Sequence, residues 1–129
     1  MRLLLDTHTL LWWTTGDPSL PERARRRIAQ SKDPVVISAV SAWEIAIKVN
    51  SGRLPSGATE LIQDFEESLK QDGFRSMSIT SDHAIRAGML PGSHKDPFDR
   101  MLIAQAQAEN MAVVSNDAVF DSYGVTRIW

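Results

Sequence analysis

The chain has 129 residues, 43% of them apolar and 23% charged, a composition typical of one globular domain spanning residues 1–129. Cysteine is absent, which excludes a disulfide framework and a thiolate zinc site. Lysines and arginines number 14 against 16 aspartates and glutamates, and the net charge of −2 argues against a broad basic surface for nucleic acid. The apolar runs are too short to span a bilayer and no secretory leader is visible, so we expect a cytoplasmic protein without a membrane partner.

The first part of the chain predicts a strand, two helices and a second strand. Arg2–Leu5 is a short apolar run typical of a buried strand, and Thr9–Trp13 is compatible with a helix. Ser19–Glu22 has the spacing of a capping box and predicts the start of a second helix. The apolar face of that helix is formed by Leu20, Ala24 and Ile28. Val35–Ser38 is rich in β-branched residues and predicts the second strand.

The rest of the chain alternates helices with short strands. One amphipathic helix that ends before Gly73 is indicated by Leu61, Ile62, Phe65 and Leu69. The other expected elements are helices at Ser41–Val49, Ser81–Ala87 and Phe98–Glu109 and strands at Phe74–Ile79, Ala112–Ser115 and Thr126–Ile128. Short apolar strands between helices are typical of a parallel sheet covered on both faces. The predicted fold class is therefore α/β, a three-layer α/β/α sandwich with a short, mostly parallel central sheet.

Four acidic residues are predicted to meet at one edge of this sheet, beyond the carboxyl ends of the strands, where open parallel sheets bind ligands. Asp6 follows the first strand and Asp117 follows the fourth. Glu44 is expected in the first turn of the helix that leaves the second strand. Asp99 is expected in the first turn of the helix that leads back to the fourth strand, and the apolar residues after it place it along the buried face.

These acids predict a metal site, because unpaired carboxylates in a partly buried site repel one another. No lysine or arginine adjoins Asp6 or Asp117 in the sequence, although Arg100 adjoins Asp99. A divalent cation would resolve the repulsion, and oxygen ligands suit Mg²⁺ or Mn²⁺ rather than zinc. Such a centre activates water and neutralises charge on a phosphodiester.

Each acid also has a structural interpretation. Glu44 completes a capping box that begins at Ser41, while Asp6 and Asp117 stand where a helix cap or an Asx-turn often follows a strand. Asp96 precedes a proline, and we expect it to cap the following helix rather than to bind a metal. The convergence of the four acids, more than any one of them, favours the metal site.

Four blocks of sequence span nearly the whole chain in a specific order. They are Leu4-Leu5-Asp6-Thr7-His8, then Val40-Ser41-Ala42-Trp43-Glu44-Ile45, then His94 to Arg100 followed by Leu102-Ile103-Ala104-Gln105-Ala106, and finally Ser115-Asn116-Asp117 with Phe120. Together they resemble the PIN-domain family and, more narrowly, its VapC-type toxins. The resemblance implies a PIN-like fold and a Mg²⁺- or Mn²⁺-dependent endoribonuclease that is usually a homodimer and is inhibited by a cognate antitoxin.

The resemblance also implies which residues act. The acidic quartet of the family matches Asp6, Glu44, Asp99 and Asp117. Asp6 and Asp99 are the expected direct metal ligands, and the other two are expected to act partly through water. Ser115 stands where the family often has threonine and keeps the hydroxyl group. His94 and Asp96 belong to the family's third block but are kept outside the core site.

Three other functions are alternatives. A phosphatase with Asp6 as its nucleophile would usually need a second acid at the position that His8 occupies. An RNA-processing nuclease that is not a toxin is the second, and a non-catalytic RNA-binding module is the third, although retention of all four acids favours an enzyme. Trp12, Trp13 and Trp43 are expected in the core or at an interface, where they could anchor an antitoxin.

Overall fold

A five-stranded sheet forms the centre of the computed structural model, which describes residues 1–54 and 56–129. Its strand order is β3-β2-β1-β4-β5, and each neighbouring pair is parallel. The strands are β1 (Leu3–Leu5), β2 (Val36–Ser38), β3 (Arg75–Met77), β4 (Ala112–Val114) and β5 (Arg127–Ile128). The predicted α/β class is confirmed, and the sheet, expected to be mostly parallel, is parallel at every described pairing.

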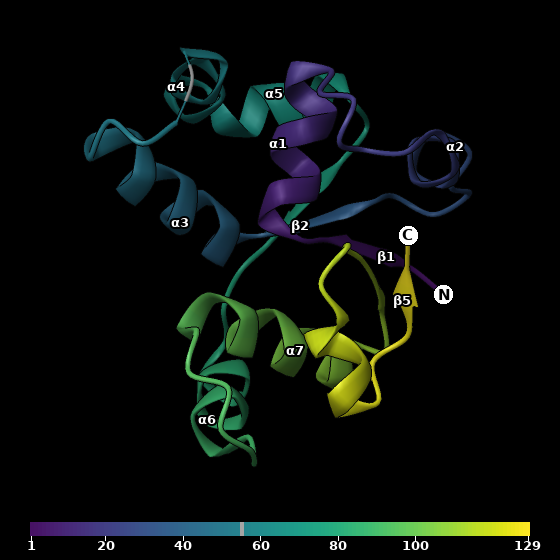
Figure 1. Cartoon of the computed structure of the whole chain (residues 1–129), viewed down its shortest axis with the longest axis vertical. Coiled ribbons are helices and arrows are strands. Elements are labelled where there is room, and N and C mark those ends of the chain that lie inside the picture. The colour runs from purple at the N-terminus through teal and green to yellow at the C-terminus, as the bar shows by residue number, and fades with distance from the viewer. Residues whose placement is uncertain (55) are drawn as a thin grey trace.

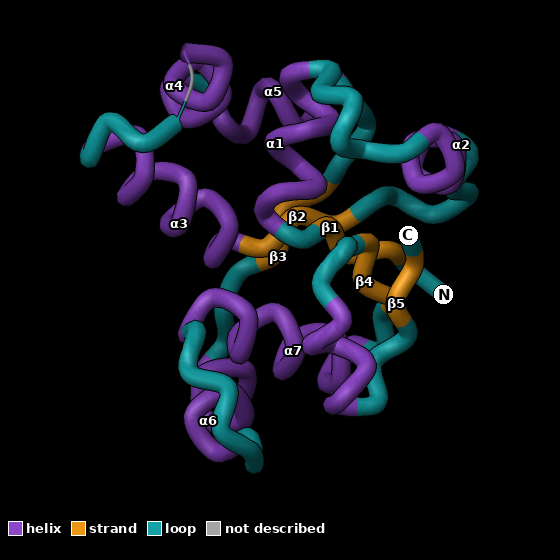
Figure 2. The backbone as a smooth tube through the Cα atoms, viewed as in Figure 1, coloured by secondary structure: helices purple, strands orange, loops and turns teal. Residues whose placement is uncertain are grey.

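Helices cover both faces of the sheet, which gives three layers (Figures 1 and 2). One face carries α1 (Thr7–Thr15), α2 (Glu22–Ala29), α4 (Ser56–Gln63) and α5 (Phe65–Gln71), with α3 (Ala39–Asn50) beside them. The other face carries α6 (Ser81–Met89), α7 (Pro97–Glu109) and the 3₁₀ helix η1 (Ala118–Tyr123). Within the two described ranges, no helix has the length and apolar character needed to cross a membrane.

Alternating side chains of the strands fill two separate cores. Leu3 and Leu5 of β1 lie in the core shared with α1 and α2, whereas Leu4 lies in the core shared with α7. Val114 and Val113 of β4 are divided between the two cores in the same way. Burying one leucine side chain contributes roughly 1.5–3 kcal/mol. Both faces therefore hold these short strands in place, and their carboxyl ends are fixed relative to one another.

Two helix starts differ from the prediction. The N-cap of α3 is Ser38, whose hydroxyl accepts from the Val40 amide at 3.0 Å, so Ser41–Glu44 is not a capping box. The N-cap of α2 is Pro21, which makes no side-chain cap bond, so Ser19–Glu22 is not a capping box either. In both cases the serine–glutamate spacing resembles a capping box but does not form one. The chain turns into α3 directly after β2, which moves that helix start upstream.

Two helical segments differ in extent. The single amphipathic helix predicted around Leu61 to Leu69 is divided into α4 and α5 at Asp64, whose φ of −141° and ψ of 55° are not helical. Helix α1 is longer than the predicted Thr9–Trp13, because Asp6 caps it at once after β1. The predicted strands agree with the observed ones apart from one or two residues at their ends.

Asp96 caps α7, as the sequence predicted. Its carboxylate accepts from the amides of Phe98 at 2.9 Å and Asp99 at 3.1 Å. We expect Asp96→Ala to lower the free energy of unfolding by about 1 kcal/mol, because both amides lose their partner. Asp96→Asn can still cap the helix and should stay within about 0.5 kcal/mol of the wild type. Urea denaturation measures both values, and equal losses in the two variants would contradict the capping role.

Candidate active site

Asp6 is a buried carboxylate at the end of β1. Its Oδ1 accepts from the Thr7 amide at 2.7 Å, and its Oδ2 accepts from the Ser115 hydroxyl at 2.6 Å. Burial raises the pKa of Asp6 and the charge of Glu44 adds to the rise, whereas the bonds from Ser115 and Thr7 oppose it. Asp6 is also the N-cap of α1. The same residue therefore caps a helix, as considered from the sequence, and belongs to the candidate acidic site.

Ser115 connects the acids of two neighbouring strands. Besides donating to Asp6, its buried hydroxyl accepts from the Asp117 amide at 3.0 Å. Asp117 in turn accepts from the Val119 amide at 2.9 Å and caps η1, so the turn considered from the sequence is present. The Asp117 residue itself is exposed. The hydroxyl of Ser115 therefore lies between the acids that follow β1 and β4.

Glu44 is buried on α3 and lies in the second turn of that helix rather than the first, because α3 begins at Ala39. Its Oε2 is 2.8 Å from the ammonium nitrogen of Lys48, one helical turn further on. Lys48 does not adjoin an acid of the site in sequence, and it was not predicted as a partner of Glu44. A glutamate followed by a lysine four residues later is a common helical ion pair and would have indicated it.

Asp99 lies in the first turn of α7, as predicted, and is half-buried. Its Oδ2 is 2.9 Å from Nε2 of His94. Burial raises the pKa of Asp99 to about 6, with the bond from His94 opposing the rise and the charges of Asp96, Asp6 and Asp117 adding to it. His94, which the sequence analysis kept outside the core site, is therefore a direct contact of one of the four acids.

The four acids lie near the starts of α1, α3, α7 and η1, and three of these elements leave the carboxyl ends of β1, β2 and β4. Their charges interact: Glu44 acts on Asp6, and Asp6 and Asp117 act on Asp99. Lys48 offsets the charge of Glu44, and His94 contacts Asp99. Among the described hydrogen bonds, Asp6 accepts only from the Thr7 amide and the Ser115 hydroxyl.

The donor chemistry of this edge fits a divalent cation that prefers oxygen. Within residues 1–54 and 56–129, no three acidic or histidine side chains are already arranged as a group that could hold a metal ion. Mg²⁺ commonly keeps several waters and is held by one or two carboxylates, so it does not require three protein ligands. Asp6 and Asp99 are the acids whose ionised forms the surroundings disfavour. A nearby cation would favour those ionised forms.

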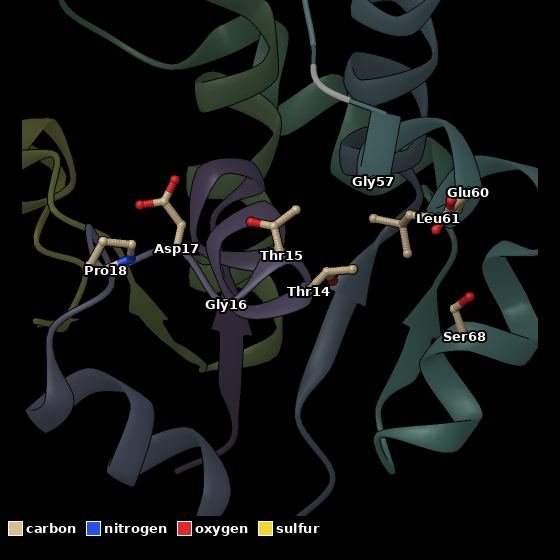
Figure 3. Close-up of a pocket in the computed structure, with 9 residues that line it drawn as sticks. All are labelled: Thr14, Thr15, Gly16, Asp17, Pro18, Gly57, Glu60, Leu61 and Ser68. Atoms are coloured by element: carbon tan, nitrogen blue, oxygen red, sulfur yellow. The ribbon is translucent and has the colours of Figure 1, made fainter.

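A separate hollow of about 660 Å³ lies between the end of α1 and helices α4 and α5 (Figure 3). Asp17 and Glu60 are part of its lining, but none of the four candidate site acids is. The pKa shifts of Asp6 and Asp99 instead place the unusual electrostatics at the carboxyl edge of the sheet. That edge, rather than this hollow, is the candidate active site.

Comparison with known proteins gives the family. The model of the PIN domain matches residues 3–125. The chain belongs to the PIN domain family. It is 28% identical over 118 residues to ribonuclease VapC22 of Mycobacterium tuberculosis, a match that covers 89% of this chain and 86% of that protein.

Solved structures share the whole fold. VapC20 of Mycobacterium tuberculosis, a sarcin–ricin loop cleaving toxin, matches with a TM-score of 0.75 and 15% identity over 98% of both chains. The VapBC2 complex of Rickettsia felis, bound to a promoter DNA fragment, matches with a TM-score of 0.73 and 16% identity over 99% of this chain and 98% of that one. DNA-bound VapBC of Salmonella typhimurium matches with a TM-score of 0.72 and 18% identity over 99% of this chain and 97% of that one. The PIN-like fold predicted from the sequence is therefore confirmed.

Ionised Asp99 is expected to destabilise the protein when no metal is bound. Its pKa is about 6 in the folded protein against an ordinary value of 3.8. Between about pH 4 and pH 6 the folded state binds more protons than the unfolded state, so stability falls as pH rises through this window. In EDTA at about pH 7.5, we expect Asp99→Asn to raise the free energy of unfolding by on the order of 1–2 kcal/mol, with no gain below about pH 4.

Asp121 provides a control with the opposite sign. Hydrogen bonds from Arg127 lower the pKa of Asp121 below its ordinary value. Its ionised form therefore stabilises the fold, and Asp121→Asn should lower stability at neutral pH, with the difference lost in acid. Denaturation curves recorded across the pH range test both variants. A neutral-pH loss of stability in Asp99→Asn would contradict the cost that burial and the neighbouring acids impose on the ionised Asp99 carboxylate.

Proposed function

We propose that this protein, as one PIN domain, is a metal-dependent endoribonuclease and the toxin of a toxin–antitoxin pair. The observation that carries the proposal is a set of interacting carboxylates at the carboxyl edge of the sheet, namely Asp6, Glu44, Asp99 and Asp117. The relatives support the substrate class: VapC22 is a ribonuclease and VapC20 is a toxin that cleaves the sarcin–ricin loop. RNA is therefore the proposed substrate.

Mg²⁺ or Mn²⁺ is the proposed cofactor. When bound, such an ion neutralises charge on the phosphodiester and makes water more acidic. Asp6 and Asp99 would hold it directly, because their surroundings disfavour the ionised carboxylate unless a cation is present. Glu44 and Asp117 would hold it partly through water, since the first is already paired with Lys48 and the second is exposed at the start of η1.

The chain's own residues would position and deprotonate the attacking water. Ser115 and Thr7 fix both oxygens of Asp6, so this carboxylate presents one orientation to the site. One carboxylate of the group accepts a proton from water as the water oxygen bonds to phosphorus. The bond from phosphorus to O3′ breaks in line and the leaving O3′ oxygen takes up a proton from solvent, which leaves a 5′-phosphate and a 3′-hydroxyl. No covalent intermediate with the protein is required.

The phosphatase alternative has less support. His8, at the position of the second acid in such enzymes, stacks on Trp12 with ring centroids 5.7 Å apart. The acid group as a whole is better suited to metal-dependent hydrolysis.

A cognate antitoxin and a second copy of the chain are the proposed protein partners in the cytoplasm. The similar structures from Rickettsia felis and Salmonella typhimurium are VapBC complexes. In this chain Trp43 is 57% exposed next to Glu44, and its ring meets that of Phe98 edge-on at 5.1 Å. Trp12 and Trp13, by contrast, pack partly against the core. An antitoxin could anchor on Trp43 while an arginine pairs with the acids.

We expect RNA cleavage to depend on the acids and on a divalent metal. Asp6→Asn and Asp99→Asn should each lower the cleavage rate more than about 100-fold, because each removes a carboxylate that would hold the ion. Excess EDTA should abolish cleavage by the wild type, and added Mg²⁺ or Mn²⁺ should restore it. Gel analysis of purified protein with structured RNAs measures the rates and identifies the product ends.

Asp121→Asn serves as the matched control, since it removes one carboxylate outside the acid group. It should retain cleavage close to that of the wild type, and denaturation curves should show that all variants are folded. Undiminished cleavage in EDTA, or by either site variant, would exclude the proposed chemistry.

Expression in bacteria tests the toxin assignment. The chain alone should arrest growth and degrade cellular RNA, whereas Asp99→Asn should not. Coexpression with the product of the neighbouring reading frame should restore growth, and Trp43→Ala should weaken binding of that product by roughly 10- to 100-fold as the loss of an aromatic anchor. Normal growth on expression alone, together with a neighbour that neither binds nor inhibits, would refute the toxin assignment while leaving the fold intact.

A further inference from the structure

A second hollow lies beside the acidic edge, and we call it the loop–η1 pocket. It has a volume of about 690 Å³ and is lined by residues 91–95 of the loop before α7 and by Val119, Ser122 and Tyr123 of η1. Small-molecule sites in proteins commonly have volumes of roughly 300–1,000 Å³. The space is therefore sufficient for a ligand the size of a nucleotide.

Both walls of the pocket lead directly to site acids. The loop wall includes His94, whose Nε2 is 2.9 Å from Oδ2 of Asp99. The η1 wall includes Val119, whose amide donates to the Asp117 carboxylate at 2.9 Å. A phosphodiester held at the acids would therefore have one of its neighbouring nucleotides at the mouth of this pocket.

The lining suits part of a nucleic acid. Its described lining combines the ammonium group of Lys95 and the imidazole of His94 with the hydroxyl groups of Ser93 and Ser122, and no aspartate or glutamate is among these described residues. These groups can donate to phosphate and to base edges, while the Tyr123 ring offers a surface on which a base can stack. The hollow of Figure 3 has a similar volume but is lined by two acids and no lysine, arginine or histidine.

The loop wall is fixed in place from the α7 side. The guanidinium of Arg100 donates to the carbonyl of Leu90 at 2.7 Å and to that of His94 at 3.0 Å. It also donates to Ala87 and Gly88 at the end of α6. Arg100 is therefore engaged by carbonyl groups on both sides of residues 91–93. It does not pair with Asp99, its neighbour in sequence.

Tyr123 fixes the loop from the η1 side. Its hydroxyl donates to the Pro91 carbonyl at 2.9 Å. Gly92 permits this approach, because its φ is +92° and a Cβ atom there would lie 2.9 Å from the Tyr123 hydroxyl. The contacts of Arg100 and Tyr123 hold this loop in one conformation. A ligand that binds to such a pre-formed wall causes a smaller loss of conformational entropy.

We propose that the loop–η1 pocket binds one unpaired nucleotide of the RNA substrate, adjacent to the phosphodiester that is cleaved. A paired base is stacked and hydrogen-bonded within its helix, so only a base turned out of the stack can enter a hollow of this kind. The inference rests on the proposed ribonuclease function and adds the subsite that selects where the RNA is cut.

Filling the pocket tests this assignment. Ser122 is exposed on η1, and Ser122→Trp should raise KM for a short single-stranded RNA at least about tenfold while changing kcat much less, because it blocks binding and leaves the acids in place. Thr14→Trp is the matched control, since Thr14 is an exposed hydroxyl residue in the hollow of Figure 3. It should leave KM unchanged, and melting curves should show that both variants are folded.

Direct binding gives a readout that does not depend on activity. Each of the four nucleoside 5′-monophosphates is added to the metal-free protein, and amide shifts are followed by NMR. The shifts should concentrate at Gly92, Ser93, Lys95 and Ser122. They should weaken at least about threefold in Lys95→Gln, which removes the cation, and not in Lys32→Gln, a lysine outside the pocket.

The outcomes separate the subsite from the nuclease. Absence of RNA cleavage by the wild type would refute the proposed function itself. A wild-type protein that cleaves RNA, together with an unchanged KM in Ser122→Trp or monophosphate shifts outside residues 91–95 and η1, would overturn the subsite. Protection of these amides by the antitoxin and not by any monophosphate would assign the pocket to a protein partner and overturn the inference as well.

Discussion

The candidate site depends on one short hydrogen bond, from the Ser115 hydroxyl to the buried carboxylate of Asp6 at 2.6 Å. It joins the ends of β1 and β4, which are 109 residues apart in the sequence. Burial alone would favour the neutral form of Asp6, and this bond helps to keep a charge available there. Because Ser115 also accepts from the Asp117 amide, the same hydroxyl sets the start of η1. The Ser115 side chain thus helps to position Asp6, Asp117 and the η1 wall of the loop–η1 pocket.

The remaining two acids, Glu44 and Asp99, each contact a group that the chain supplies itself. Lys48 pairs with Glu44 and His94 contacts Asp99, so negative charge at the edge is only partly offset. A buried carboxylate without a cation costs stability, and the two apolar cores under and over the sheet supply the stability that offsets it. The arrangement resembles functional sites in general, where local repulsion persists because the surrounding structure enforces it.

The sequence predicted the architecture well because the buried strands and the long α7 have clear patterns. Asp6 and Asp99 could be placed at the carboxyl edge since strand polarity determines that edge. Helix starts were less certain: the same serine–glutamate spacing suggested caps at Ser19 and Ser41, but the observed caps are Pro21 and Ser38. A local spacing cannot show where a strand ends and the chain turns.

The side chains around the acids were harder to predict than the acids themselves. Lys48 was visible in the spacing, but the contact of His94 with Asp99 depends on the path of an irregular loop. Arg100 adjoins Asp99 in sequence, yet its guanidinium group donates to backbone carbonyls and not to that carboxylate. Such contacts are set by the three-dimensional course of the chain, which no periodicity encodes.

The parallel pairing of β1 with β4 has a consequence for the synthesis of this protein. Strand β1 emerges from the ribosome first, and about a hundred further residues must be synthesised before β4 can pair with it. Contacts between such distant segments form late in folding. Until then Asp6 has neither Ser115 nor Asp99 and Asp117 beside it, so the proposed acidic site is not yet assembled on the nascent chain. The proposed site can therefore form only after nearly the whole chain has been synthesised.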